Sequence, residues 1–140
     1  MKVRLLIIAL CCLAAAGFAQ PAKPGNAYTQ ISQATRAKDA DKNVAYTISA
    51  IWKNTATPEN IFFRADDLWQ NCIVEKNNVE ISPDKIKKGD KIVFRTMSGG
   101  KFAIPELLKK IPTPALFFQV DKKWYYLPVR NIIPGKVKAK

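Results

Sequence analysis

Alternation of apolar and polar residues predicts a β-domain over residues 43–133. In "VAYTISAIW" (Val44–Trp52), every second residue from Val44 onward is apolar, while Ala45, Thr47 and Ser49 occupy positions between them. This period of two is typical of a half-buried strand. Turn residues separate it from further predicted extended segments at Ile61–Ala65, Cys72–Lys76, Val79–Ile81 and Lys91–Met97.

The pattern changes near residue 105. "PELLKKI" (residues 105–111) has proline at a first helical position, glutamate in the first turn and two lysines at the end, which predicts one short helix. Next, "ALFFQV" and "WYYLPV" flank "DKK", which indicates a β-hairpin with a three-residue loop. Pro128 in the last strand is typical of a sheet edge.

These segments predict a mostly β, small single domain. About six to eight short strands with one short helix near 105–111 favour an antiparallel β-sandwich or a partly open barrel. The segment Val79–Phe94, a strand, a Gly–Asp turn and a second strand, resembles part of the cupredoxins. That resemblance implies a Greek-key β-layout but no copper, since both histidine ligands of a blue-copper site are absent.

The amino-terminal segment has the features of a secretory signal peptide. Lys2 and Arg4 precede an apolar run that is shorter than the about 20 residues of a membrane-spanning helix. Gly17 and Ala19 occupy the positions that signal peptidase recognises, so we expect cleavage after Ala19 and export to the periplasm or the medium. Removing residues 1–19 lowers the formal net charge from +12 to +10.

The remaining chain is expected to have three parts. Residues 20–42 are polar with early proline and glycine, and they read as a flexible tether or frayed helix outside the core. Residues 43–133 form the β-domain, and residues 134–140 form a basic tail. No later apolar run predicts a membrane span in the mature chain.

Several chemistries are excluded or unsupported by the residue types. The chain has no histidine, which removes Ser–His and Cys–His catalysis and histidine-based zinc sites. Cleavage would leave Cys72 as the single cysteine, and its place in an apolar strand favours a buried side chain over a reactive thiol. Gly100–Lys101 lacks the earlier glycine and the following hydroxyl residue of a phosphate loop. The sequence therefore predicts no catalytic residue, metal or cofactor.

Lysines at the predicted turns are the strongest candidate for function. Lys87 and Lys88 precede one strand, Lys101 follows it, and Lys122 and Lys123 occupy the hairpin tip. In Trp124–Tyr126, alternation places Trp124 and Tyr126 on one face, which leaves Tyr125 as the candidate for an outward aromatic that stacks on a sugar or a base. Lysines at turns also keep β-proteins soluble, and a helix or the amino-terminal segment covering the second face would bury that aromatic.

The resulting hypothesis is an exported, non-enzymatic binding or interaction module of the bacterial cell envelope. Its expected partners are anionic glycans, lipids or an envelope protein, and not nucleic acid. Two alternatives remain open. Carboxylates such as Asp66, Asp67, Glu59 and Asp90 would serve a hydrolase of envelope glycans if two of them met across a cleft. A structural subunit would instead pair with a partner through an edge strand.

Overall fold

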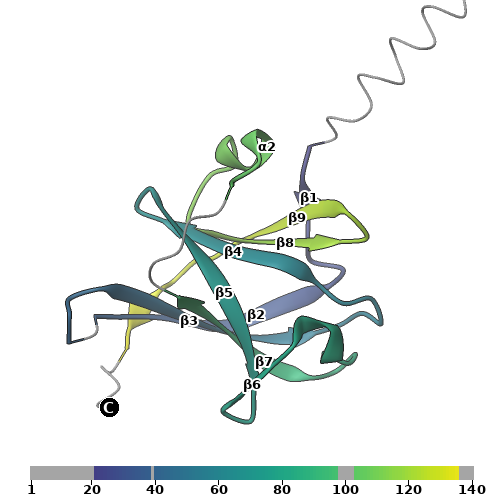
Figure 1. The fold of residues 1–140 in the computed structure, drawn as a ribbon, viewed down its shortest axis with the longest axis horizontal. Coiled ribbons are helices and arrows are strands. Elements are labelled where there is room, and N and C mark those ends of the chain that lie inside the picture. The colour runs from purple at the N-terminus through teal and green to yellow at the C-terminus, as the bar shows by residue number, and fades with distance from the viewer. Residues whose placement is uncertain (1–20, 39, 98–102, 136–140) are drawn as a thin grey trace, which may run out of the picture.

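The computed structural model describes residues 21–38, 40–97 and 103–135, which form one curled, mixed β-sheet (Figure 1). In chain order its strands are β1 (Lys23–Pro24), β2 (Thr29–Lys38), β3 (Val44–Trp52), β4 (Glu59–Ala65), β5 (Leu68–Lys76), β6 (Val79–Ile81), β7 (Lys91–Met97), β8 (Ala115–Val120), β9 (Lys123–Pro128) and β10 (Ile133–Pro134). A 3₁₀ turn, η1 (Pro83–Lys85), and one short helix, α2 (Glu106–Lys109), complete the secondary structure of the described residues.

The sheet has the order β1-β9-β8-β4-β5-β7-β3-β2-β10, with β6 paired to β5, and it curls into a half-barrel. The prediction of a mostly β fold with one short helix, in the form of a partly open barrel, is confirmed. The strands number ten, more than expected, because two-residue strands extend both edges. Those strands, β1 on β9 and β10 on β2, also pair in parallel, whereas the longer strands pair antiparallel as expected.

Three hairpins are joined by two-residue loops of the same kind. Asp66–Asp67, Asn77–Asn78 and Asp121–Lys122 have positive φ at both positions, as in the type I′ turns whose twist matches that of paired strands. The predicted three-residue loop "DKK" is therefore wrong. Val120 pairs with Lys123, so Lys123 is the first residue of β9 and Asp121–Lys122 alone form the loop.

The prediction that residues 20–42 form a flexible tether or frayed helix outside the core is wrong for most of that segment. Residues 29–38 form β2, which pairs with β3 along its whole length and has Thr29 and Ala34 buried. β1 pairs with β9 at the opposite edge of the sheet. Residues 1–20, where the signal peptide is predicted, and residues 136–140 of the predicted basic tail lie outside the described residues.

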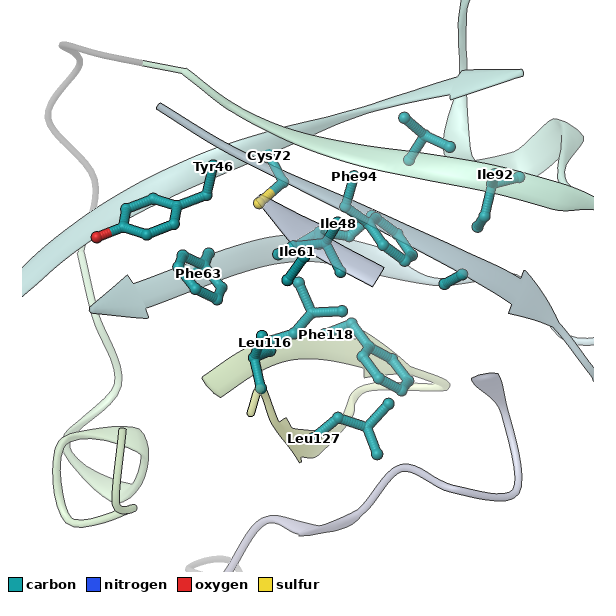
Figure 2. Packing of buried hydrophobic residues seen from close by; sticks show 14 of the residues in the cluster. Tyr46, Ile48, Ile61, Phe63, Cys72, Ile92, Phe94, Leu116, Phe118 and Leu127 are labelled. Carbon is teal, nitrogen blue, oxygen red and sulfur yellow. The ribbon is translucent and has the colours of Figure 1, made fainter. Parts of the chain in front are cut away.

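Side chains from both halves of the curled sheet fill its interior. Figure 2 shows Phe63, Leu116 and Phe118 from β4 and β8 facing Ile48 and Phe94 from β3 and β7. All five are fully buried. The inward residues of β3 are those that alternation predicted, so its period of two is confirmed.

A second, smaller apolar cluster lies on the outer face of the sheet. Phe62, Phe117 and Ala115 pack there against Leu108 of α2, with Trp124 and Tyr126 at its margin. Trp124 stacks on Phe62 with a ring-centroid distance of 5.8 Å. The helix and its flanking residues therefore cover the outer face of β4, β8 and β9, above the sheet in Figure 1.

Candidate anion-binding site

Strand directions bring several lysine-bearing loops to one end of the half-barrel. β3 and β8 end there, and β2, β7 and β9 begin there, as the pairs Thr29–Trp52, Ile51–Lys91 and Val120–Lys123 show. The β8–β9 hairpin and the start of β2 lie on the same side in Figure 1. We call the exposed lysines of these loops the basic mouth: Lys53, Lys87, Lys88, Lys122 and Lys123.

A continuous set of hydrogen bonds joins these loops. The Gly89 amide, next to Lys88, donates to the Trp52 carbonyl at 2.7 Å. The next residue, Lys53, donates its amide to the Tyr28 carbonyl, also at 2.7 Å. The Tyr28 hydroxyl then donates to the Tyr125 hydroxyl across the mouth at 3.2 Å. Two predicted lysine pairs, 87–88 and 122–123, therefore lie at the ends of one connected structure.

Aromatic rings pack together next to Lys53 and the lysines of the β8–β9 hairpin. The Tyr28 and Tyr125 ring centroids are 4.6 Å apart, and Phe118 stacks on Tyr125 at 5.8 Å. Hydrogen bonding to the Tyr125 hydroxyl, with a smaller effect of burial, raises the pKa of Tyr28. Tyr28 therefore remains a neutral hydrogen-bond donor at physiological pH, as an unperturbed tyrosine would.

The predicted orientation of Tyr125 is wrong. Its ring packs against the interior cluster, and it is Trp124 and Tyr126 that lie on the outer face. Alternation correctly placed Trp124 and Tyr126 on one face and Tyr125 on the other. Both faces of the sheet are covered, however, so none of the three side chains projects freely into solvent. Tyr125 instead lies half-buried at the open end of the interior, between Tyr28 and the hairpin lysines.

Asp90 anchors the turn that carries Lys87 and Lys88. Its carboxylate accepts the Lys87 amide at 2.9 Å and the Lys76 ammonium at 3.0 Å. These two hydrogen bonds, the backbone one first, hold the pKa of Asp90 below its ordinary value. Asp90 is thereby paired with the turn backbone and with Lys76 of β5, whereas Lys87 and Lys88 are exposed and form no ion pair among the described residues.

Tyr28 and Lys53 were not candidates from the sequence. Tyr28 fell in the segment read as a tether, and Lys53 follows a strand without any lysine neighbour that would mark a cluster. Tyr28 was nonetheless the only aromatic of its polar segment, which is a usable signal. Lys101, predicted to share the site, lies outside the described residues.

The carboxylates considered for a hydrolase are divided between the two ends of the sheet. Asp66 and Asp67 form the β4–β5 turn, where Asp67 pairs with Arg64 at 3.0 Å. Glu59 begins β4, at the other end of that strand, and Asp90 is held in the turn before β7. The Asp66–Asp67 pair therefore does not meet Glu59 or Asp90 across a cleft.

Neither thiol chemistry nor a metal centre is evident in the described part of the chain. Cys72 is buried, and burial raises the pKa of its thiol, which disfavours the reactive thiolate. No group of three or more Cys, Asp or Glu side chains within residues 21–38, 40–97 and 103–135 is placed to hold a metal ion.

No protein-family model matches this chain, and no curated protein or solved structure is detectably similar to it. Among the residues that the structure describes, no helix combines the length and apolar character needed to cross a membrane.

Proposed function

We propose that this chain is an exported binding module of the bacterial cell envelope that holds an acidic glycan at the basic mouth. The observation that carries the proposal is that three lysine-bearing loops lie at one end of the sheet and are connected by hydrogen bonds through Tyr28 and Tyr125. Clustered positive charge attracts polyanions, and neighbouring aromatic rings and hydroxyls suit sugar units. The sequence of residues 1–19 supports export.

A glycan is favoured over a lipid surface by the distribution of exposed apolar side chains. Stable interfacial binding needs an apolar face that enters the membrane beside the cations. The exposed large apolar residues of the described chain are Ile51, Leu68, Val79, Met97 and Ile133, and they come from five different strands. Ile51, at 36% exposure, and Val79, at 63%, lie at strand ends on the side of the mouth. They come from β3 and β6, which do not pair with each other, so no continuous apolar face accompanies the lysines.

The test is a binding series with the protein produced from the full-length gene. The ligands are an acidic polysaccharide, a neutral polysaccharide of similar length and anionic lipid vesicles, each at several salt concentrations. We expect the acidic polysaccharide to bind, and its affinity to fall as salt screens the lysines.

Paired substitutions locate the binding surface. Exposed ion pairs are worth about 0.2–1 kcal/mol each, so K87Q/K88Q and K122Q/K123Q should each weaken binding about 2- to 30-fold. K109Q/K110Q removes the same charge from the exposed end of α2 and should leave the affinity unchanged. Equal losses in all three variants, or an affinity independent of salt, would overturn the proposal. Preferential binding to vesicles would replace the glycan with a lipid surface.

A further inference from the structure

A pocket lies in the seam where the half-barrel is not closed by hydrogen bonds between strands. β9 pairs with β1 only at Tyr125 and Tyr126, and β2 pairs with β10 only at Thr35 and Arg36. Between these contacts, the start of β2 faces the end of β9 across a pocket of ≈ 350 Å³. This volume is at the small end of ligand sites, so it suits one sugar ring better than a longer segment.

The pocket combines one cation, several neutral polar groups and an apolar wall. Its lining residues are Asn26, Thr29, Gln30, Ile31, Lys53, Leu127 and Pro128. Hydroxyl-bearing ligands bind through such amides and hydroxyls, while the C–H face of a sugar ring packs on apolar side chains. Leu127, only 7% exposed, supplies a fixed apolar surface.

Lys53 is the charged group of this pocket and also belongs to the basic mouth. Its ammonium donates one hydrogen bond to the Asn26 carbonyl at 3.0 Å, which fixes the head group beside the pocket. An ammonium has three protons, so two remain for a ligand. The ion pairs formed within the described residues do not include Lys53, so no carboxylate of the described chain competes for it.

A single carboxylate matches this charge better than a phosphate group does. A phosphate monoester carries about −1.5 to −2 charges and three acceptor oxygens, whereas the pocket offers one lysine and no arginine. A sugar acid also uses the amides of Asn26 and Gln30, which a bare anion would leave without partners. The lining therefore favours a uronic acid over a phosphorylated unit.

An extended peptide is a poorer occupant, because both edges are interrupted. The register of β2 against β3 shifts between Ile31 and Gln33, which marks a bulge in β2. Pro128 has no amide hydrogen to donate from the edge of β9. Bulges and prolines are devices that prevent strand addition at sheet edges.

We propose that the seam pocket binds a single hexuronic acid unit, with its carboxylate on Lys53 and its ring against Leu127 and Pro128. This inference rests on the proposed function, since the rest of the acidic glycan continues over the basic mouth. It adds the class of sugar and a defined subsite, and it explains how a charged surface distinguishes one polyanion from another.

The test uses an α-1,4-linked galacturonic acid trisaccharide, its methyl ester and inorganic phosphate as probes. Esterification removes the charge and keeps the shape. We expect the free acid to bind and to shift the NMR methyl signals of Ile31 and Leu127, and we expect the ester to bind at least about tenfold more weakly, the loss of one charged hydrogen bond. The K53Q substitution should weaken binding of the free acid by about the same factor. Q30W, which fills the pocket from an exposed strand position, should abolish the methyl shifts.

K91Q is the matched control, since Lys91 is an exposed lysine at the same end of the sheet and does not line the pocket. The pocket inference is wrong if K53Q and K91Q behave alike, if the acid and ester bind equally, or if phosphate displaces the trisaccharide. Polysaccharide binding that depends on Lys87 and Lys88, without any trisaccharide binding, would overturn the pocket and keep the proposed function. If the trisaccharide bound in the pocket but the acidic polysaccharide did not bind to the protein, the proposed glycan binding at the basic mouth would be wrong instead.

Discussion

Replacing Gly25 with alanine tests how the amino-terminal segment closes the open end of the half-barrel. Gly25 donates its amide to the Tyr126 carbonyl at 2.8 Å and accepts the Tyr28 amide at 3.0 Å, so it links β1, β2 and β9. A methyl group at this position would lie 2.6 Å from Cζ and 2.9 Å from Cε1 of the Phe118 ring. Phe118 is fully buried and stacks on Tyr125, so its ring has no free space to move into.

The expected cost is that of overpacking a close-packed core. Such insertions cost about 1–3 kcal/mol. A domain of this size loses about 4 °C of melting temperature per kcal/mol, so G25A should melt about 4–12 °C below the wild type. Gly25 does not have positive φ, and the penalty therefore contains no backbone strain. Thermal unfolding followed by circular dichroism measures the difference.

Two companion variants isolate the cause. In G25A/F118L the shorter side chain removes the ring atoms that the methyl group meets, so the double variant should lose less stability than the sum of the single variants. G89A provides the opposite case, because Gly89 has a φ of +92° and nothing lies within 4 Å of an added methyl group. Any loss of stability in G89A would come from backbone strain alone, so adding F118L should not reduce that loss. The steric explanation is refuted if G25A has the same melting temperature as the wild type. It is also refuted if the stability losses of G25A and F118L simply add in the double variant.

Two further predictions concern buried and paired polar groups. The Thr96 hydroxyl accepts the Tyr46 amide at 2.8 Å in the interior, so T96V should lower the free energy of unfolding in urea by about 1–3 kcal/mol, and T96S, which keeps the acceptor, should lose less. Because the pKa of Asp90 is lowered in the folded protein, its carboxylate stabilises the fold at pH values above the ordinary aspartate pKa of about 3.9. This contribution is lost as the pH falls through the lower pKa of the folded state. D90N should therefore melt below the wild type at neutral pH, and the difference should close in acid; a constant difference would contradict the assignment.

The central strands could be predicted because their side chains alternate strongly. In β3 and β7, Ile48, Trp52 and Phe94 point into one interior, and most of the residues between the inward positions are small or polar, so the period of two is visible in the sequence. The short helix was predictable from Pro105 and its charge pattern. Turn chemistry gave the positions of the hairpins, although not the loop length at Asp121–Lys122, since "DKK" has no glycine or asparagine to mark positive φ.

β2 was missed because burial in that strand falls on small residues. Thr29 and Ala34 are its fully buried positions, and neither gives the hydrophobic contrast on which alternation depends. The strand is stabilised by pairing along β3, and its register depends on a partner that follows it in the chain. The composition of a segment indicates only how much apolar surface its own side chains can bury. The conformation of β2 depends instead on its hydrogen bonds to β3, which its composition does not reveal.

The basic mouth required the fold because its parts are far apart in the chain. Tyr28 and Tyr125 are separated by 97 positions, yet their hydroxyls are in contact. Local alternation correctly placed Tyr125 on the face opposite to Trp124, but the inference that one face is solvent-exposed assumed a sheet covered on one side. Because both faces of the sheet are covered, the partly accessible aromatic side chains lie at the end of the sheet, near the turns, and not on one of its faces. Since lysines are tolerated at turns for solubility in any β-protein, their shared end, and not their number, is what makes this surface a candidate for recognition.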